Sequence, residues 1–131
     1  MRTVVEEVKV RSIPFTDAAG ERWDLCSGPD LYCELYGPAG DLLYESEVVT
    51  DVRPSDLPLS MDAGFALTES GPHILRVLDA DFSGDERVGR VAFEPERLAA
   101  AGQGPEPPPC VQFEDGETTL WVALRWEEAP G

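Results

Sequence analysis

The stretch between Ile74 and Gly89 reads ILRVLDADFSGDERVG and changes in character halfway along. Its apolar start is typical of a buried strand. Four carboxylates then stand within eight residues around a Ser-Gly turn, at Asp79, Asp81, Asp85 and Glu86. Carboxylates this close repel one another unless a cation or water separates them. Because Ca²⁺ accepts several oxygen ligands in flexible geometry, the stretch predicts a calcium-binding loop at the end of a strand.

The same stretch has two other interpretations. Asp, Ser and Gly are common turn residues, so the pattern is also typical of an ordinary solvated turn. An EF-hand loop would need a glutamate at its twelfth position, where this chain has Arg90. The segment before Asp79 also has the pattern of a strand and not of a helix. The EF-hand interpretation therefore fails, whereas the choice between a metal-binding loop and a solvated turn stays open.

The length and charge of the chain limit its class. Its 131 residues predict a single domain over 1–131, with a core from about residue 3 to residue 127. The formal net charge of −16 opposes nucleic-acid binding, which requires clustered Lys and Arg. The same charge opposes adsorption to anionic lipid, so any membrane association would need Ca²⁺ as a bridge.

Targeting signals and cysteine chemistry give further limits. No apolar run is long enough to span a membrane, and the charged start MRTVVEEV does not resemble a signal peptide. We therefore expect a soluble, cytoplasmic protein, with peripheral attachment to a membrane as an alternative. Three cysteines without a C-x-x-C spacing argue against a disulfide framework and a zinc site. Cys33 lies in an apolar alternation and is expected to be a small core residue.

Short strand patterns and turns alternate along the rest of the chain. Strand patterns occupy 3–10, 31–36, 42–49, 64–68, 73–78, 88–93 and 118–126. Residues 51–60, which contain prolines, are expected to be irregular or to form a sheet edge. The only helical pattern, at 95–101, is short. About eight short strands with frequent turns predict an all-β, eight-stranded antiparallel sandwich with one short helix.

A second acidic segment comes directly before the strand pattern at 31–36. It reads DLCSGPDLY, with Asp24 and Asp30 six positions apart around a Gly-Pro turn. Together, the two acidic segments resemble those of a C2 domain, an eight-stranded antiparallel sandwich that binds Ca²⁺ between loops at one end. In that family the first loop carries Asp-x5-Asp followed by Pro-Tyr. The third loop carries Asp-x-Asp and a further acidic residue shortly before an Ile-Gly or Val-Gly pair.

The resemblance covers nearly the whole chain, from Val5 to Trp126. The matching positions are Asp24, Asp30 and Tyr32 in the first loop, and Asp79, Asp81, Val88 and Gly89 in the third. Two positions depart from the family pattern. Pro29 precedes Asp30 instead of following it, and the third loop is one residue shorter than the commonest form. The last acidic ligand is therefore either Asp85 or Glu86, of which Asp85 has the more usual residue type.

The resemblance implies a Ca²⁺ site made by Asp24, Asp30, Asp79, Asp81 and either Asp85 or Glu86. Mg²⁺ would fit less well, because it keeps its waters and a strict octahedral geometry. In C2 domains the calcium end often docks onto lipid through apolar loop tips, for which Trp23, Leu25 and Phe82 are candidates unless they simply pack over the loops. We expect a module that associates, in the presence of Ca²⁺, with a phospholipid membrane or a protein partner. A metal-free structural or protein-interaction sandwich is the alternative.

No pattern in the chain favours an enzyme. The sequence has no G-x-S-x-G elbow and no phosphate-binding glycine loop. It also offers no Ser or Cys with a plausible His base. The lone histidine, His73, follows a Gly-Pro turn and is expected to be solvated rather than to bind a metal. We therefore expect a binding module and no catalytic residues.

Overall fold

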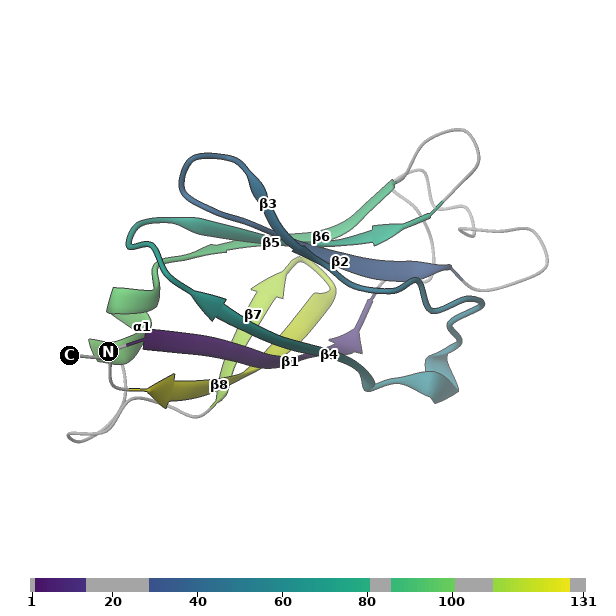
Figure 1. Ribbon diagram of the computed structural model, residues 1–131. Coiled ribbons are helices and arrows are strands. Elements are labelled where there is room, and N and C mark those ends of the chain that lie inside the picture. The colour runs from purple at the N-terminus through teal and green to yellow at the C-terminus, as the bar shows by residue number, and fades with distance from the viewer. Residues whose placement is uncertain (1, 14–28, 81–85, 101–109, 128–131) are drawn as a thin grey trace.

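The computed structural model of the chain describes residues 2–13, 29–80, 86–100 and 110–127. Within these ranges, eight strands form two four-stranded sheets that pack face to face (Figure 1). One sheet has the order β4-β1-β8-β7, and the other has the order β3-β2-β5-β6. All of these pairings are antiparallel. The eight-stranded antiparallel sandwich predicted from the sequence is thus confirmed.

The strands follow one another along the chain with two short helical turns between them. In chain order, the elements are β1 (Arg2–Ser12), β2 (Leu31–Tyr36), β3 (Leu42–Glu45), the 3-10 turn η1 (Pro54–Asp56), β4 (Leu59–Leu67), β5 (His73–Asp79), β6 (Glu86–Phe93), α1 (Pro95–Ala100), β7 (Cys110–Asp115) and β8 (Thr118–Glu127). The α1 helix and η1 lie at opposite ends of the sandwich (Figure 1). No helix in the described ranges is long and apolar enough to span a membrane.

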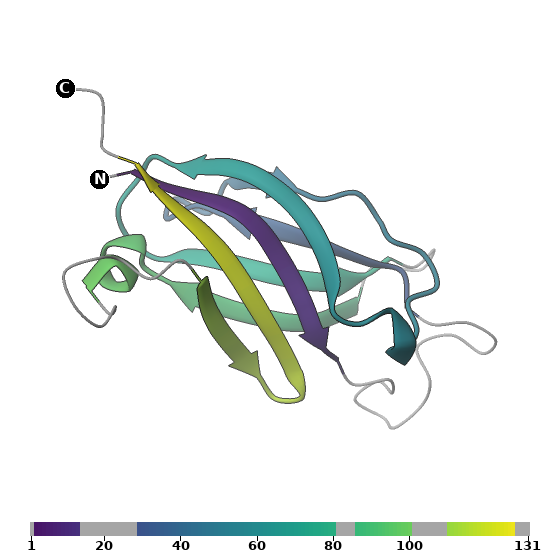
Figure 2. The same ribbon diagram turned by 90° about the horizontal axis from the view of Figure 1, so that it is seen from below.

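The first sheet is built around β1, which lies between β4 and β8 (Figure 2). Val5 and Val8 both belong to the core, although they are three positions apart on one strand. A register shift between Val5 and Glu7 makes this possible, because a β-bulge inserts one residue and restores the alternation on its far side. The bulge therefore keeps the apolar residues of β1 on the buried face.

The core lies between the two sheets and follows the period-two pattern of the strands. Leu120, Val122 and Leu124 of β8 face it, as the alternation at 118–126 predicts. The other sheet contributes Cys33, which is fully buried and makes no disulfide. Burial raises the pKa of the Cys33 thiol, because the charged thiolate would lose its water. The prediction that Cys33 is a small core residue is therefore confirmed.

One edge of the sandwich is closed by contacts between β6 and the β7–β8 hairpin. The Thr118 hydroxyl donates a hydrogen bond of 2.8 Å to the Val88 carbonyl oxygen. A Cβ atom at Gly89 would lie 2.6 Å from Cγ2 of Thr118, which is closer than real Cβ contacts allow. The Arg90 N–H also donates to Asp115 Oδ2 across this edge, at 2.8 Å. The Val-Gly pair therefore has a packing role in this chain.

Two strands depart from the predicted boundaries. Strand β7 was not predicted, because only Val111 and Phe113 of its six residues pack against the core and a run of prolines precedes it. Strand β4 begins at Leu59, five residues earlier than the predicted strand at 64–68. Prolines hid the start of β4, although its partner β1 holds this segment in register from Leu59 onwards.

His73 is buried, so the prediction of a solvated histidine is wrong. Its side chain is fully inaccessible, and its ring stacks on Phe93 with 5.8 Å between the ring centroids. Its Nδ1 lies 2.9 Å from the carbonyl oxygen of Gly71. Because a carbonyl oxygen only accepts, Nδ1 is the donor in this bond. The local turn and the Phe93 ring thus replace the water that the Gly-Pro-His pattern indicated.

Candidate cation-binding end of the sandwich

Asp30 and Asp79 meet at one end of the sandwich because β2 and β5 are antiparallel neighbours. Leu31, the first residue of β2, pairs with Asp79, the last residue of β5. The Asp30 N–H donates to Asp79 Oδ1 at 2.9 Å, across 49 positions of sequence. The Ala80 N–H returns a 2.8 Å hydrogen bond to the Asp30 carbonyl oxygen. The two acidic segments singled out in the sequence are therefore joined directly.

Asp79 is unusually buried for a carboxylate. Only 3% of its surface is exposed. Ionised carboxylates are costly to bury unless hydrogen bonds or a cation compensate their charge. The bond from the Asp30 N–H supplies part of this compensation, but it comes from a neighbour that carries a carboxylate of its own. A buried acid beside a second acid is the local condition that favours a bound cation.

A third aspartate, Asp51, lies beside Asp30 and was not singled out from the sequence. The segment before it pairs with the start of β2, since Val49 and Leu31 exchange backbone hydrogen bonds of 2.7 and 2.8 Å. The Asp51 N–H then donates to Asp30 Oδ1 at 2.8 Å. Asp51 has a φ of 52°, in the left-handed region that Asp and Asn tolerate better than most residues. We term Asp30, Asp51 and Asp79 the acidic end.

Topology offers a signal for Asp51 that the sequence patterns did not use. Strand β2 runs away from Asp30, and the turn at 37–41 sends β3 back in the opposite direction. Residues that follow β3 must therefore return to the end where β2 began. Val52 confirms this return, because its N–H donates to the Pro29 carbonyl oxygen at 2.9 Å. A predicted hairpin is thus sufficient to place an acid near position 51 beside Asp30.

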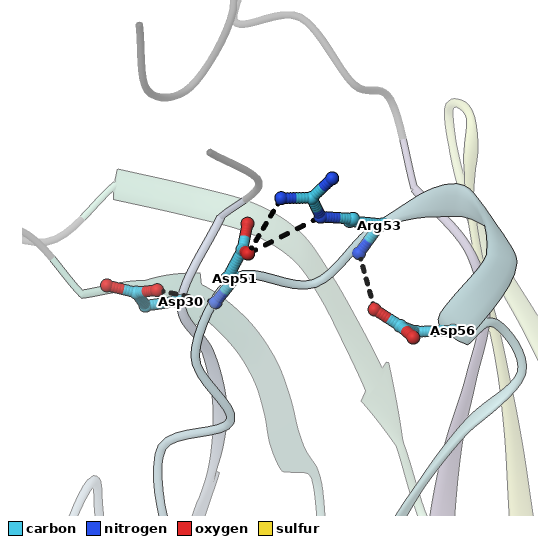
Figure 3. A network of polar contacts seen from close by, with 4 residues as sticks. All are labelled: Asp30, Asp51, Arg53 and Asp56. Atoms are coloured by element: carbon cyan, nitrogen blue, oxygen red, sulfur yellow. Dashed lines mark hydrogen bonds and ion pairs between the residues drawn. The ribbon is translucent and has the colours of Figure 1, made fainter. Parts of the chain in front are cut away.

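Arg53 brings a positive charge to the acidic end. Its Nη2 and Nε lie 3.1 and 3.4 Å from the same oxygen, Oδ2 of Asp51. Figure 3 shows the Asp51 side chain between Asp30 and the Arg53 guanidinium. The Arg53 N–H donates to Asp56 Oδ2 at 2.9 Å, which fixes its backbone at the start of η1. With 62% of its side chain exposed, Arg53 forms this ion pair in contact with water.

The six predicted ligands have different outcomes. The structure brings Asp30 and Asp79 together, whereas Asp24, Asp81 and Asp85 lie outside the described residues, as do Trp23, Leu25 and Phe82. The backbone of Glu86 begins β6 opposite Asp79. Among the residues that the structure describes, no three His, Cys, Asp or Glu side chains form a group able to hold a metal ion. The described aspartates are therefore two members of the predicted site and a neighbour, and not a complete coordination shell.

The donor atoms at the acidic end fit Ca²⁺ in kind. They are carboxylate oxygens, which hard cations prefer, whereas softer metals select nitrogen and sulfur ligands. Cys33 lies in the core with its thiol pKa raised, and His73 lies at the start of β5, the end of that strand opposite to Asp79. Neither side chain reaches the junction of Asp30 and Asp79. The chemistry of the described donors is thus that of an oxygen-only site.

Farther along β2 and β5, a different arrangement compensates a buried acid. Glu34 and Arg76 are register partners, and Arg76 Nη2 lies 2.6 Å from Glu34 Oε1. The hydrogen bond to Glu34 raises the pKa of Arg76. Arg76 also contacts Tyr36, with 3.3 Å to its hydroxyl and 5.1 Å to its ring centroid. Here the chain supplies the cation itself, next to a glutamate that is only 8% exposed.

Comparison with known proteins finds likeness in structure. No protein-family model matches the sequence, and no curated protein matches it. A solved C2 domain superposes with a TM-score of 0.60 at 16% identity, covering 95% of both chains. Human GIVD cytosolic phospholipase A2, in a complex that includes terbium chloride, superposes with a TM-score of 0.62 at 18% identity.

The coverage of the larger proteins is one-sided. The match spans 98% of this chain but only 17% of that phospholipase chain. The two C2 domains of Extended-Synaptotagmin 2, in a calcium-bound structure, match with a TM-score of 0.52 at 14% identity, over 95% of this chain and 44% of theirs. At such identities the likeness carries the architecture and leaves the ligand open. Two packed antiparallel sheets and these superpositions together show that the chain has a C2-like fold.

Proposed function

We propose that this C2-like module binds Ca²⁺ at its acidic end and uses the bound ion to associate with a membrane or a protein partner. The observation that carries the proposal is the junction of Asp30 and Asp79. A carboxylate that is only 3% exposed receives a hydrogen bond from a residue that is itself an aspartate. A divalent cation would offset the charge that these two residues concentrate at the strand ends.

Asp30 and Asp79 would hold the ion together with the predicted ligands Asp24, Asp81 and either Asp85 or Glu86. When bound, Ca²⁺ would supply positive charge and open coordination positions for an anionic group of a partner. The calcium-bound Extended-Synaptotagmin 2 domains and the terbium-containing phospholipase complex support this assignment, because both superpose on this chain. The net charge of −16 supports a role for the ion as the bridge to anionic lipid.

The ion pair of Arg53 with Asp51 favours a second candidate function. It gives one of the three aspartates an internal partner, so part of the charge at the acidic end is balanced without metal. A metal-free scaffold or adaptor that uses the same sandwich for protein contacts is therefore the alternative. We propose no enzymatic role, and the complete burial of Cys33 and His73 supports this, since neither side chain is open to a substrate.

Calorimetric titration of chelator-treated protein tests the proposal. We expect saturable heat with Ca²⁺, little with Mg²⁺, and a rise in melting temperature that is selective for Ca²⁺. The double variant Asp30→Asn with Asp79→Asn should lose the heat while keeping the fold. A matched control, Glu45→Gln with Glu69→Gln, removes two exposed carboxylates elsewhere and should bind as the wild type does. Heat retained in the aspartate variant would contradict the site.

Vesicle sedimentation then separates the partners. If lipid is the partner, vesicles that contain phosphatidylserine should pellet the wild-type protein with Ca²⁺ and release it with chelator. Binding of Ca²⁺ without vesicle binding would point to a protein partner. No Ca²⁺ binding by the wild type would instead favour the metal-free scaffold.

A further inference from the structure

Arg53 is held at the acidic end in a way that separates its backbone from its side chain. The backbone N–H is fixed by Asp56 Oδ2 at 2.9 Å. The guanidinium, in contrast, reaches Asp51 through two nitrogens that share one oxygen, and 62% of the side chain is exposed. An exposed pair of this kind is weak and readily exchanged. The side chain can therefore leave Asp51 without disturbing the turn at η1.

Asp51 is fixed more firmly than its partner. Its N–H is bound to Asp30 Oδ1 at 2.8 Å, and the next residue, Val52, is bound to the Pro29 carbonyl oxygen at 2.9 Å. Val52 is 1% exposed and belongs to the core. These contacts hold the Asp51 carboxylate close to Asp30 whether or not Arg53 is paired with it. The negative charge of Asp51 thus acts on the same place as that of Asp30.

We propose that Arg53 competes with Ca²⁺ for Asp51 and thereby lowers the calcium affinity of the acidic end. This inference rests on the proposed function and adds its regulation. A cation bound at Asp30 is attracted by Asp51 only to the extent that the guanidinium does not already neutralise that carboxylate. Binding of Ca²⁺ therefore displaces Arg53, and by reciprocity the Arg53–Asp51 pair opposes binding of Ca²⁺. The pair sets the concentration at which the acidic end fills.

The variant Arg53→Gln tests this competition by calorimetry. Glutamine keeps the backbone N–H that Asp56 accepts, but it removes the positive charge. We expect the dissociation constant for Ca²⁺ to fall by about two- to fivefold, the range that one exposed ion pair supports. The difference from the wild type should shrink between low salt and about 0.5 M NaCl, because exposed charges are screened.

Two controls show whether the effect passes through Asp51. Asp51→Asn keeps the left-handed backbone, because Asn tolerates it. In that background, Arg53→Gln should change the affinity no further. Arg97→Gln removes another exposed arginine with an acidic neighbour, Glu94, in α1 at the opposite end of the sandwich. It should leave the dissociation constant unchanged, since only a general charge effect would act from there.

Each outcome decides the inference. Tighter binding in Arg53→Gln that vanishes in the Asp51→Asn background supports it. Equal affinity of the wild type and Arg53→Gln overturns the competition while leaving the calcium site intact. Tightening that persists without the Asp51 charge, or that Arg97→Gln reproduces, also overturns it. If neither the wild type nor Arg53→Gln gives heat with Ca²⁺, the proposed function fails and the competition with it.

Discussion

Strands β2 and β5 carry buried acids at two places, and the chain compensates them differently. In the middle of the strands, Glu34 faces Arg76 in the register and forms an ion pair of 2.6 Å. At the strand ends, the Asp79 carboxylate accepts from the N–H of Asp30, another acid. The first place is balanced by an arginine of the chain, whereas the second concentrates negative charge. Burial of an acid is therefore structural where an arginine stands opposite and points to a cation where a second acid does.

The difference predicts opposite effects of removing charge at the two places. The largest effect should come from Arg76→Met, which leaves Glu34 buried without its cation. We expect the free energy of unfolding to fall by about 1–2 kcal/mol, less than for a fully buried pair because 34% of the Arg76 side chain is exposed. Urea denaturation measures this loss, and adding Glu34→Gln should restore most of it. Unchanged stability of the single variant would mean that Glu34 needs no internal cation.

At the acidic end the sign should reverse. In chelator, Asp30→Asn with Asp79→Asn should raise the free energy of unfolding by about 0.5–1 kcal/mol, because it removes repulsion between neighbouring carboxylates. Asparagine keeps a side-chain oxygen for the Asp30 N–H and the Asp51 N–H. Added NaCl should stabilise the wild type more than the variant, since salt screens the repulsion. A variant less stable than the wild type in chelator would show that the aspartates are structural.

An uncharged contact elsewhere gives the smallest effect and sharpens the contrast. The Tyr44 hydroxyl of β3 donates to the Asp62 carbonyl oxygen of β4 at 2.6 Å and so links the two sheets. Tyr44→Phe should cost about 0.5–1 kcal/mol near neutral pH. Unlike the variants above, this loss should not depend on NaCl or Ca²⁺. Dependence on either would place Tyr44 under the influence of the acidic end.

The same tyrosine predicts a pH dependence. Burial raises the pKa of Tyr44 above its ordinary value of 10.0. The folded state therefore favours the neutral phenol, and the resulting stability is fully present below that ordinary value and is lost as the pH rises through the raised pKa. We expect the wild type to lose more stability than Tyr44→Phe above about pH 10. Parallel losses in melts between about pH 8 and pH 11 would contradict this assignment.

Much of the fold could be predicted because strand alternation reports directly on burial. Leu120, Val122 and Leu124 alternate with polar or exposed positions, and all three lie in the core. Strand β7 escaped because too few of its residues are apolar, and its pairing with β8 supplies the order that its own sequence lacks. His73 escaped for a related reason, since its burial depends on Phe93 from the neighbouring strand β6. Local patterns do not report such partners.

The candidate site divides in the same way. Asp30 and Asp79 could be predicted as neighbours, because each flanks a strand whose pattern is clear. Asp51 could not be found by spacing, since its position depends on the return of β3 and on the bonds of Val49 to Leu31. Asp24, Asp81 and Asp85 stay predictions, because they lie outside the described residues. Arg53 was missed because a single arginine in a proline-containing segment has no pattern of its own.

The central claim is that the acidic end takes from solution the kind of charge that Arg76 supplies to Glu34 within the chain. Calorimetric titration of the chelator-treated wild-type protein with Ca²⁺, beside Asp30→Asn with Asp79→Asn, tests it most directly. We predict saturable heat for the wild type, none for the variant, and unchanged folding of both by circular dichroism. Absence of heat from the wild type, or equal heat from both proteins, would contradict the claim.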